Sequence, residues 1–221
     1  MKRLFINIIL FSLVSTIVVS ALDAEESKMT FPNPPDLNVM EEGTRTAVFA
    51  GGCFWGIEGV FERLEGVTNV ISGYSGGKAE TAVYSKVGSG ATDHAEAVQI
   101  TYDSSVISYG TLLKVFFATA HDPTQLNFQG PDLGTQYRSE IFYFDRDQKR
   151  ISEKYIKGLD KAMVFPKKIV TKVSPYKAFY PAEPYHQDFM KNNPNYPYIV
   201  YWDLPKVKHL EDNFPELLAG Q

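Results

Sequence analysis

The sequence predicts an α+β fold, a sheet with helices packed on it, and two features carry this prediction. Segments with the two-residue hydrophobic period of strands are mixed with segments that have the 3.6-residue period of amphipathic helices. The two kinds do not alternate strictly, as they would in a parallel α/β fold. The chain has 221 residues, which suffices for one domain with a substantial core.

The first 21 residues have the pattern of a signal peptide. Lys2 and Arg3 precede an apolar run at 4–19, and the residues at 19–21 suit cleavage. The alternative is an uncleaved membrane anchor, but a spanning helix needs about 20 apolar residues. We therefore expect a protein exported to the periplasm or secreted, with no stable membrane insertion after cleavage.

The remainder divides into an arm, a domain and a tail. Residues 22–45 are polar and contain several prolines, so we expect a flexible arm. The folded domain is expected at 46–205, and a C-terminal tail at 206–221. Little regular hydrophobic pattern follows the last expected helix, which ends at residue 191. Strands are expected at 46–50, 67–73, 95–102, 140–144 and 169–173, and helices at 54–64, 108–120, 147–162 and 185–191.

These elements have local reasons. Apolar residues recur at helical spacing in 54–64 and in 108–120, whereas the segment 147–162 is heavily charged and should form an exposed helix. The first two strands end in glycine-rich turns. Residues 122–136 form a long loop rich in Gly, Pro, Asn and Gln, and loops of this length are often functional.

Composition removes several functional classes. The formal net charge is -4, and no basic cluster suggests nucleic-acid binding. The chain has one cysteine, Cys53, so an intramolecular disulfide and a thiolate-rich metal site are both excluded. No two of the four histidines have the i, i+4 spacing of a helical metal site, and we expect no metal.

Cys53 is the candidate nucleophile. It lies where a predicted strand and two glycines meet a predicted helix, in the run Gly-Gly-Cys-Phe-Trp-Gly at 51–56. Unpaired N–H groups and the positive end of the helix dipole favour a thiolate there, so we expect the thiol pKa to fall. The alternative is a buried, inert cysteine. Phe54 and Trp55 could line a pocket for a small apolar group or belong to the core.

Glu96 is the candidate proton donor. In the strand 95–102 it shares a face with Val98 and Ile100, the face expected to be buried. Burial disfavours the carboxylate, so the pKa of Glu96 should rise and the acid should stay protonated near neutral pH. The alternative is a strand-end residue that reaches solvent or pairs with Lys or Arg.

Other side chains could assist this acid. Tyr84 and Tyr137 could donate a hydrogen bond to a substrate oxygen, although ordinary packing is the common role of a tyrosine. A histidine paired with Cys53 would instead indicate acyl transfer, and nothing in the spacing selects one. The four histidines are His94, His121, His186 and His209.

Several motifs in order resemble the A-type peptide-methionine (S)-S-oxide reductases along nearly the whole domain. The run at 51–56 resembles their active-site run, and 73–77 resembles their glycine-rich turn. Residues 94–98, with Tyr84 before them, resemble the acid-bearing strand. The remaining matches are at 121–125, 134–139, 182–183 and 185–187.

The resemblance implies a ferredoxin-like α/β sandwich with a mixed sheet, and it implies residue roles. Cys53 would attack the sulfur of the S epimer of methionine sulfoxide, free or in a peptide or protein. Phe54 and Trp55 would hold the substrate methyl group. The products would be methionine and a sulfenic acid on Cys53.

The same resemblance assigns the oxygen-binding side of the site. Glu96, with Tyr84 and Tyr137, would hydrogen-bond and protonate the sulfoxide oxygen. Asp132, in the loop beside them, would help to orient the site.

One departure concerns how the cysteine is restored. Many members of this family carry further cysteines near the C-terminus that resolve the sulfenic acid, and this chain has none. It therefore resembles a single-cysteine member that uses an external thiol: thioredoxin, glutaredoxin with glutathione, or dithiothreitol in vitro. We expect no bound cofactor and a monomer. Two alternatives stay open, a cysteine hydrolase or acyltransferase and a non-catalytic binder of oxidised methionine.

Overall fold

The computed structural model describes residues 31–35 and 42–220. The expected signal peptide at 1–21 and most of the expected arm at 22–45 lie outside the described residues. Among the helices of the described part, none is long and apolar enough to cross a membrane.

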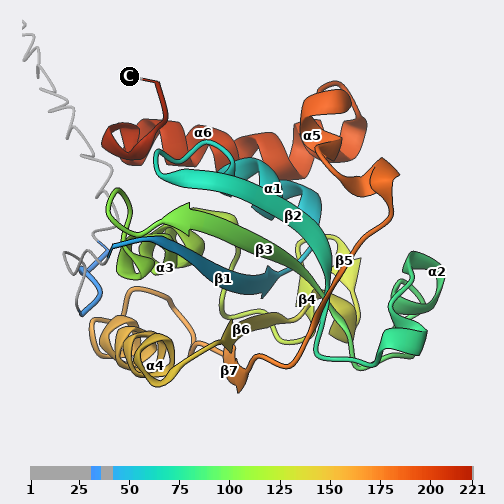
Figure 1. The fold of residues 1–221 in the computed structure, drawn as a ribbon, viewed down its shortest axis with the longest axis horizontal. Coiled ribbons are helices and arrows are strands. Elements are labelled where there is room, and N and C mark those ends of the chain that lie inside the picture. The colour runs from blue at the N-terminus through green and yellow to red at the C-terminus, as the bar shows by residue number, and fades with distance from the viewer. Residues whose placement is uncertain (1–30, 36–41, 221) are drawn as a thin grey trace, which may run out of the picture.

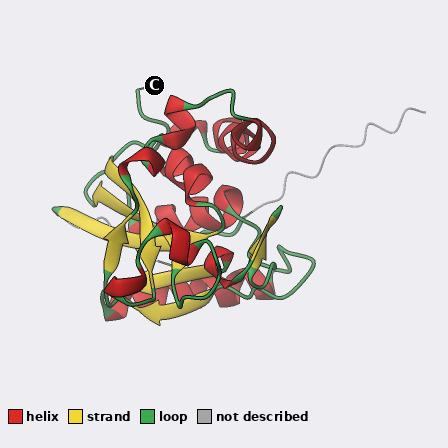
Figure 2. Ribbon diagram, turned by 90° about the vertical axis from the view of Figure 1, so that its right-hand side faces the viewer, coloured by secondary structure: helices red, strands yellow, loops and turns green. Residues whose placement is uncertain are grey.

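A six-stranded mixed sheet forms the centre of the fold (Figure 1). Its strands are β1 (Thr44–Gly51), β2 (Val67–Ser75), β3 (Ala95–Asp103), β6 (Ser139–Tyr143), β7 (Lys172–Pro175) and β8 (Phe179–Pro181). Their order is β7-β6-β1-β3-β2-β8, and every pair is antiparallel except β6 with β7. Two shorter strands form a separate hairpin beside the sheet (Figure 2), β4 (Phe128–Gln129) and β5 (Asp132–Leu133).

Helices account for about half of the remaining described residues. The α-helices are α1 (Phe54–Phe61), α2 (Tyr84–Val87), α3 (Tyr109–Val115), α4 (Arg146–Lys161), α5 (Phe189–Asn192) and α6 (Leu204–Asn213). The 3-10 helices are η1 (Ala79–Thr81), η3 (Thr135–Tyr137), η4 (Pro184–His186) and η6 (Pro215–Leu217), and the π-helices are η2 (Phe116–Ala120) and η5 (Ile199–Asp203).

The topology confirms the predicted α+β, ferredoxin-like fold. In chain order the central elements run β1-α1-β2-β3-α3-β6, and their strands lie in the sheet order β6-β1-β3-β2. This is the split βαβ arrangement, in which β3 is inserted between two parallel strands joined by a helix. The helix α1 therefore starts at the end of a central strand, β1.

The main core lies on one face of the sheet. Helices α1, α3, α4 and α6 contribute to it, and Phe49 of β1 and Ile57 of α1 are fully buried there. The opposite face carries small side chains such as Ala50 and Ala97. Tyr176 packs on these from the segment that leads from β7 to β8, which crosses the sheet in Figure 1.

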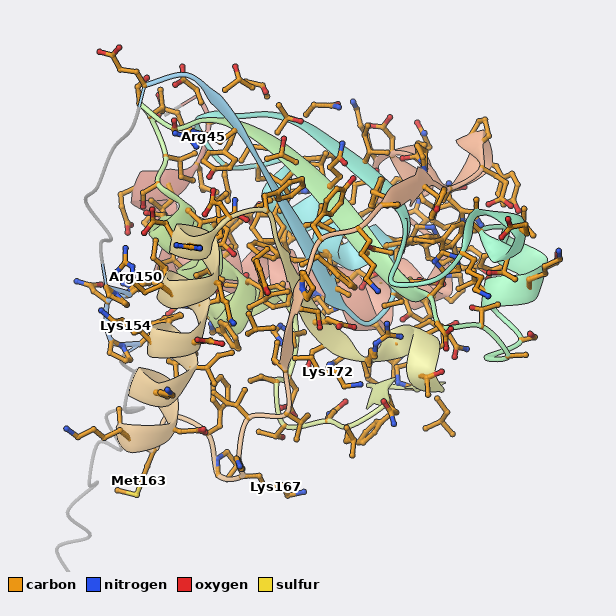
Figure 3. All side chains as sticks on the ribbon, turned by 60° about the horizontal axis from the view of Figure 1, so that its bottom comes forward. Arg45, Arg150, Lys154, Met163, Lys167 and Lys172 are labelled. Carbon is orange, nitrogen blue, oxygen red and sulfur yellow. The ribbon has the colours of Figure 1, made fainter. Side chains whose placement is uncertain are left out.

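Helix α4 is amphipathic, as its charge pattern predicts. Ile151, Tyr155 and Leu159 recur at helical spacing and are buried. Arg150 and Lys154 lie on the outer side of the helix (Figure 3). The helix begins after Asp145, whose side chain accepts a hydrogen bond from the backbone N–H of Gln148.

The C-terminal part corrects three expectations. The predicted helix at 185–191 is divided into η4 and α5, because Asp188 between them is left-handed, with φ 51°. The predicted strand at 169–173 begins only at Lys172. The region after 191, expected to be irregular, contains η5, α6 and η6, and α6 packs on α1. Pro205 obscured this helix in the sequence, although proline is well tolerated in a first helical turn.

Candidate active site

Cys53 lies at the junction between β1 and α1, as predicted, and is the N-cap residue of α1. The turn before it depends on Gly52, which has φ 102°. A Cβ at Gly52 would lie 2.5 Å from Cγ of Gln129, so the loop packs directly on this turn. The Gln129 amide in turn hydrogen-bonds the backbone N–H and C=O of Asp122, both at 3.0 Å. The long loop is thereby fastened to the segment that carries the cysteine.

The predicted fall in the thiol pKa of Cys53 is wrong. A backbone hydrogen bond from Trp55 does lower this pKa, as the helix N-terminus argument requires. However, Cys53 is only 7% exposed, and burial, followed by the negative charges of Glu96 and Asp203, raises its pKa well above the ordinary value. Resting Cys53 is therefore a thiol at neutral pH, and any nucleophilic attack must include removal of its proton.

Glu96 is the buried acid that the strand pattern predicts. It is 2% exposed, while Val98 and Ile100 on the same face of β3 are fully buried. Its Oε2 accepts a hydrogen bond from the backbone N–H of Phe54 at 3.2 Å. Burial raises its pKa to about 8, against the lowering effect of that N–H. Glu96 therefore holds a proton at pH 7 one residue away from Cys53.

The two predicted tyrosines lie in the same site. Burial, followed by the charges of Glu96 and nearby groups that include Cys53, raises the phenol pKa of both Tyr84 and Tyr137. Both phenols stay protonated and can donate hydrogen bonds. Tyr84 is held by Glu183, whose Oε1 accepts from the Tyr84 backbone N–H at 2.9 Å.

Asp132 also belongs to this cluster. It lies on β5, and its Oδ2 accepts a hydrogen bond from the hydroxyl of Tyr198. Burial raises the pKa of Asp132, and the Tyr198 hydroxyl lowers it. Its charge in turn raises the pKa of Glu96. Asp132 thus acts on the acid.

The two aromatic residues after Cys53 have different environments. Phe54 is 1% exposed and packs beside the ring of His186 at a centroid distance of 5.1 Å. Trp55 is partly exposed, stacks on Phe189 at 3.8 Å and donates from Nε1 to Nδ1 of His186 at 3.2 Å. The Tyr198 ring meets Trp55 edge-on at 5.8 Å. Trp55 is therefore a fixed aromatic wall with an accessible part.

Cys53 has no hydrogen bond to any of the four histidines, all of which the structure describes. His94, His121 and His186 have other partners, respectively the Lys78 carbonyl, the Phe116 carbonyl and the Trp55 indole. Burial lowers the pKa of His121 to about 4. A cysteine–histidine pair for acyl transfer is thus not assembled.

Sequence reasoning missed Tyr198, Asp203 and Lys206, because the region after 191 was expected to be irregular. These residues lie on the segment before η5, at the end of η5 and in the first turn of α6. The charges of Asp203 and Lys206 both act on the thiol of Cys53. An acid and a lysine three residues apart are a weak signal by themselves, and only packing of α6 on α1 brings them here.

A cysteine at a helix N-terminus, with a protonated buried acid bonded to the next backbone N–H and phenols around it, forms a site suited to cysteine chemistry with a proton donor in place of a histidine base. The comparisons with known proteins agree. Residues 45–217 match the family described as "Peptide methionine sulfoxide reductase". The chain belongs to this family and is an oxidoreductase.

Individual relatives support the assignment. The protein named peptide methionine sulfoxide reductase MsrA 2 from Mesorhizobium japonicum is 59% identical over 177 residues, which cover 80% of this chain and 91% of the relative. The protein of the same name from Synechocystis sp. is 50% identical and covers 81% and 84%.

Solved structures resemble the fold as well. Mxr1 from Saccharomyces cerevisiae in its reduced form is 32% identical, with a TM-score of 0.64, over 72% of this chain and 92% of that one. Methionine sulfoxide reductase A of Corynebacterium diphtheriae is 32% identical, with a TM-score of 0.61, over 74% and 84%. The family match includes α6, which the sequence did not predict.

Proposed function

We propose that this chain reduces the S epimer of methionine sulfoxide, free or within peptides and proteins, to methionine, with Cys53 as the nucleophile. The observation that carries the proposal is the pairing of Cys53 with Glu96, a buried acid bonded to the next backbone N–H at 3.2 Å. Family membership supplies the substrate class.

The net chemistry is a transfer of oxygen from one sulfur to another. The Cys53 sulfur attacks the sulfoxide sulfur and forms an S–S bond, while the substrate oxygen takes up the protons of Glu96 and of the Cys53 thiol and leaves as water. Water then attacks the Cys53 sulfur, returns a proton to Glu96 and breaks the S–S bond, which leaves methionine and a sulfenic acid on Cys53. Cys53 is oxidised by two electrons, and the sulfoxide is reduced to a thioether. The oxygen leaves the substrate sulfur only when it is protonated, and Glu96, with a pKa of about 8, has that proton available at pH 7.

The neighbouring groups have complementary tasks in this proposal. The hydroxyls of Tyr84 and Tyr137 hydrogen-bond the sulfoxide oxygen, and Asp132 supports the protonated state of Glu96 by its negative charge. The ring of Trp55, fixed by His186 and Phe189, and Phe54 hold the substrate methyl group. Because oxygen and methyl sites are separate, only one sulfoxide epimer presents its sulfur to Cys53.

Restoration of Cys53 requires an outside reductant. The chain has one cysteine, so one external thiol must displace water from the sulfenic acid, and a second thiol must then release the mixed disulfide. Thioredoxin, glutaredoxin with glutathione, or dithiothreitol in vitro could supply these thiols. No cofactor takes part in this cycle, and a monomer suffices for it.

Export is part of the proposal. It is supported by the leader pattern at 1–21. Cell fractionation with N-terminal analysis of the exported form tests it. A protein that keeps residues 1–21 and stays with the membrane would contradict cleavage.

Turnover with both epimers tests the activity. With excess dithiothreitol, the S sulfoxide should yield methionine and the R sulfoxide should not. Cys53→Ser removes the nucleophile while keeping a small polar side chain, so it should yield none. Equal turnover of both epimers, or an active Cys53→Ser protein, would reject the proposal.

A further inference from the structure

Gly56, the last residue of the run at 51–56, packs against two charged residues, Asp203 and Lys206, that have no role in the proposed reaction so far. A Cβ at this position would lie 2.1 Å from Oδ1 of Asp203 and 2.9 Å from Nζ of Lys206. The space that a side chain at Gly56 would fill is therefore occupied by charged groups from the end of η5 and the start of α6. Gly56 is the third residue of α1, within the first turn after Cys53.

The two charged groups form a buried ion pair. Nζ of Lys206 lies 3.0 Å from Oδ1 of Asp203, and their side chains are 19% and 0% exposed. Oδ2 of Asp203 is buried and has no hydrogen-bond partner. A buried pair with an unsatisfied oxygen is a poor source of stability, since apolar side chains of the same size would often do as well. Its place beside the nucleophile suggests a use other than stability.

Both charges affect the ionisation of the Cys53 thiol. Asp203 raises the pKa of the Cys53 thiol, and Lys206 lowers it. From β3, Glu96 acts in the same direction as Asp203. Lys206 also interacts with Asp132.

Other titratable groups face the site from further elements. Tyr84 of α2, Tyr137 of η3 and Tyr198, next to η5, are protonated phenols that respond to the charge of Cys53. His121, which also interacts with Lys206, is neutral near pH 7 because burial lowers its pKa to about 4. Glu96 acquires its charge only as the pH rises through about 8, so near pH 7 Asp203 and Lys206 are the main charged groups that act on Cys53, and at higher pH Glu96 acts with Asp203.

We propose that Asp203 and Lys206 are positioning residues for the reaction. They pack against Gly56 in the first turn of α1, so that a fixed cation and a fixed anion act on the Cys53 sulfur. Lys206 stabilises the thiolate that forms when Cys53 loses its proton. Asp203 holds the ammonium in place and limits that stabilisation, so that the resting cysteine stays a thiol. This inference rests on the proposed role of Cys53 as nucleophile.

Alkylation of Cys53 by iodoacetamide, followed by mass spectrometry across pH, measures the effect without any sulfoxide. Asp203→Asn keeps the side-chain shape and leaves Lys206 charged, so the alkylation profile should move to lower pH by about 1 unit. Lys206→Met should move it to higher pH by a similar amount, and Lys206→Arg should stay near the wild type. Lys208→Met is the matched control, because Lys208 is an exposed lysine of α6 paired with Asp212.

Opposite shifts in the first two variants support the proposal, because a merely structural disturbance would not change sign with the charge removed. Shifts in the same direction, or an Asp203→Asn profile that coincides with that of Lys208→Met, would overturn it. Circular dichroism identifies any variant that fails to fold. If Lys206→Met does not fold, the comparison of Asp203→Asn with Lys206→Arg still decides the test. Because no sulfoxide is present, the result is independent of whether the chain reduces methionine sulfoxide.

Discussion

The backbone N–H of Phe54 donates a hydrogen bond to Oε2 of Glu96 across 3.2 Å. This N–H is one of the donors that a helix N-terminus leaves unsatisfied, and here a side chain from β3 satisfies it. The bond fixes the acid beside the residue that follows Cys53. It also lowers the pKa of Glu96, which burial alone would raise further than about 8. The position and the pKa of Glu96 therefore both depend on the helix that begins after Cys53.

Glu96→Gln should slow methionine formation most below pH 8. In the wild type, Glu96 is a proton donor below its pKa of about 8 and loses this role as the pH rises. The amide can still accept from Phe54 but cannot protonate the oxygen, so the loss should be about 100-fold near pH 6.5. Single-turnover rates from pH 6 to 9.5 measure the wild-type to variant ratio. A ratio that is constant across pH would contradict the assignment.

The same substitution should stabilise the protein at higher pH. Unfolded Glu96 ionises above about 4.5, whereas folded Glu96 ionises only near 8. Glu96 therefore lowers the stability of the wild type as the pH rises from about 4.5 to 8, and Glu96→Gln removes this contribution. The free energy of unfolding of the variant relative to the wild type should increase by roughly 2–4 kcal/mol between pH 5 and pH 8. Urea denaturation at both pH values checks this, and an unchanged difference would show that Glu96 is not desolvated.

Tyr198→Phe should reduce kcat/KM by about tenfold, because it leaves the half-buried Asp132 carboxylate without its donor. The phenylalanine ring retains the edge contact with Trp55. Tyr201→Phe is a suitable control, since Tyr201 is 74% exposed on the same segment. Equal activity of the two variants would remove Asp132 and Tyr198 from the site.

His186→Phe should raise KM for the sulfoxide by roughly three- to tenfold, because Trp55 loses the acceptor for its indole N–H. The effect on kcat should be smaller, since neither Cys53 nor Glu96 is touched. His209→Phe serves as a control at an exposed position of α6. Steady-state kinetics of both variants measure this effect. An unchanged KM for His186→Phe would show that the position of Trp55 does not matter for substrate binding.

Local patterns in the sequence singled out Cys53 and Glu96 as candidates, and they left an inert cysteine and a solvent-facing acid open as alternatives. The strand, the two glycines and the following helix place Cys53 as predicted, and the period-two pattern of β3 places Glu96 on the buried face with Val98 and Ile100. These features depend on neighbours in the chain, so a single sequence contains them. The roles of the other predicted residues rest on the family resemblance, although the structure does bring them together.

The thiol pKa and the C-terminal residues could not be derived in that way. The helix N-terminus does lower the pKa of Cys53, but this effect is outweighed by burial, by Glu96 and by Asp203, which lies 150 positions further along the chain. Lys206 and Tyr198 reach the site only because α6 and η5 pack on α1. Effects of this kind depend on tertiary contacts that no local period reports.

The most direct test of the central claim is a single turnover without reductant. The protein, reduced and freed of thiols, is mixed with an excess of the S epimer of methionine sulfoxide, and methionine and protein mass are both measured. One cysteine and no resolving thiol predict about one methionine per chain and a sulfenic acid on Cys53 that adds one oxygen and reacts with dimedone. Methionine formed without oxidation of Cys53, or no methionine at all, would contradict the account.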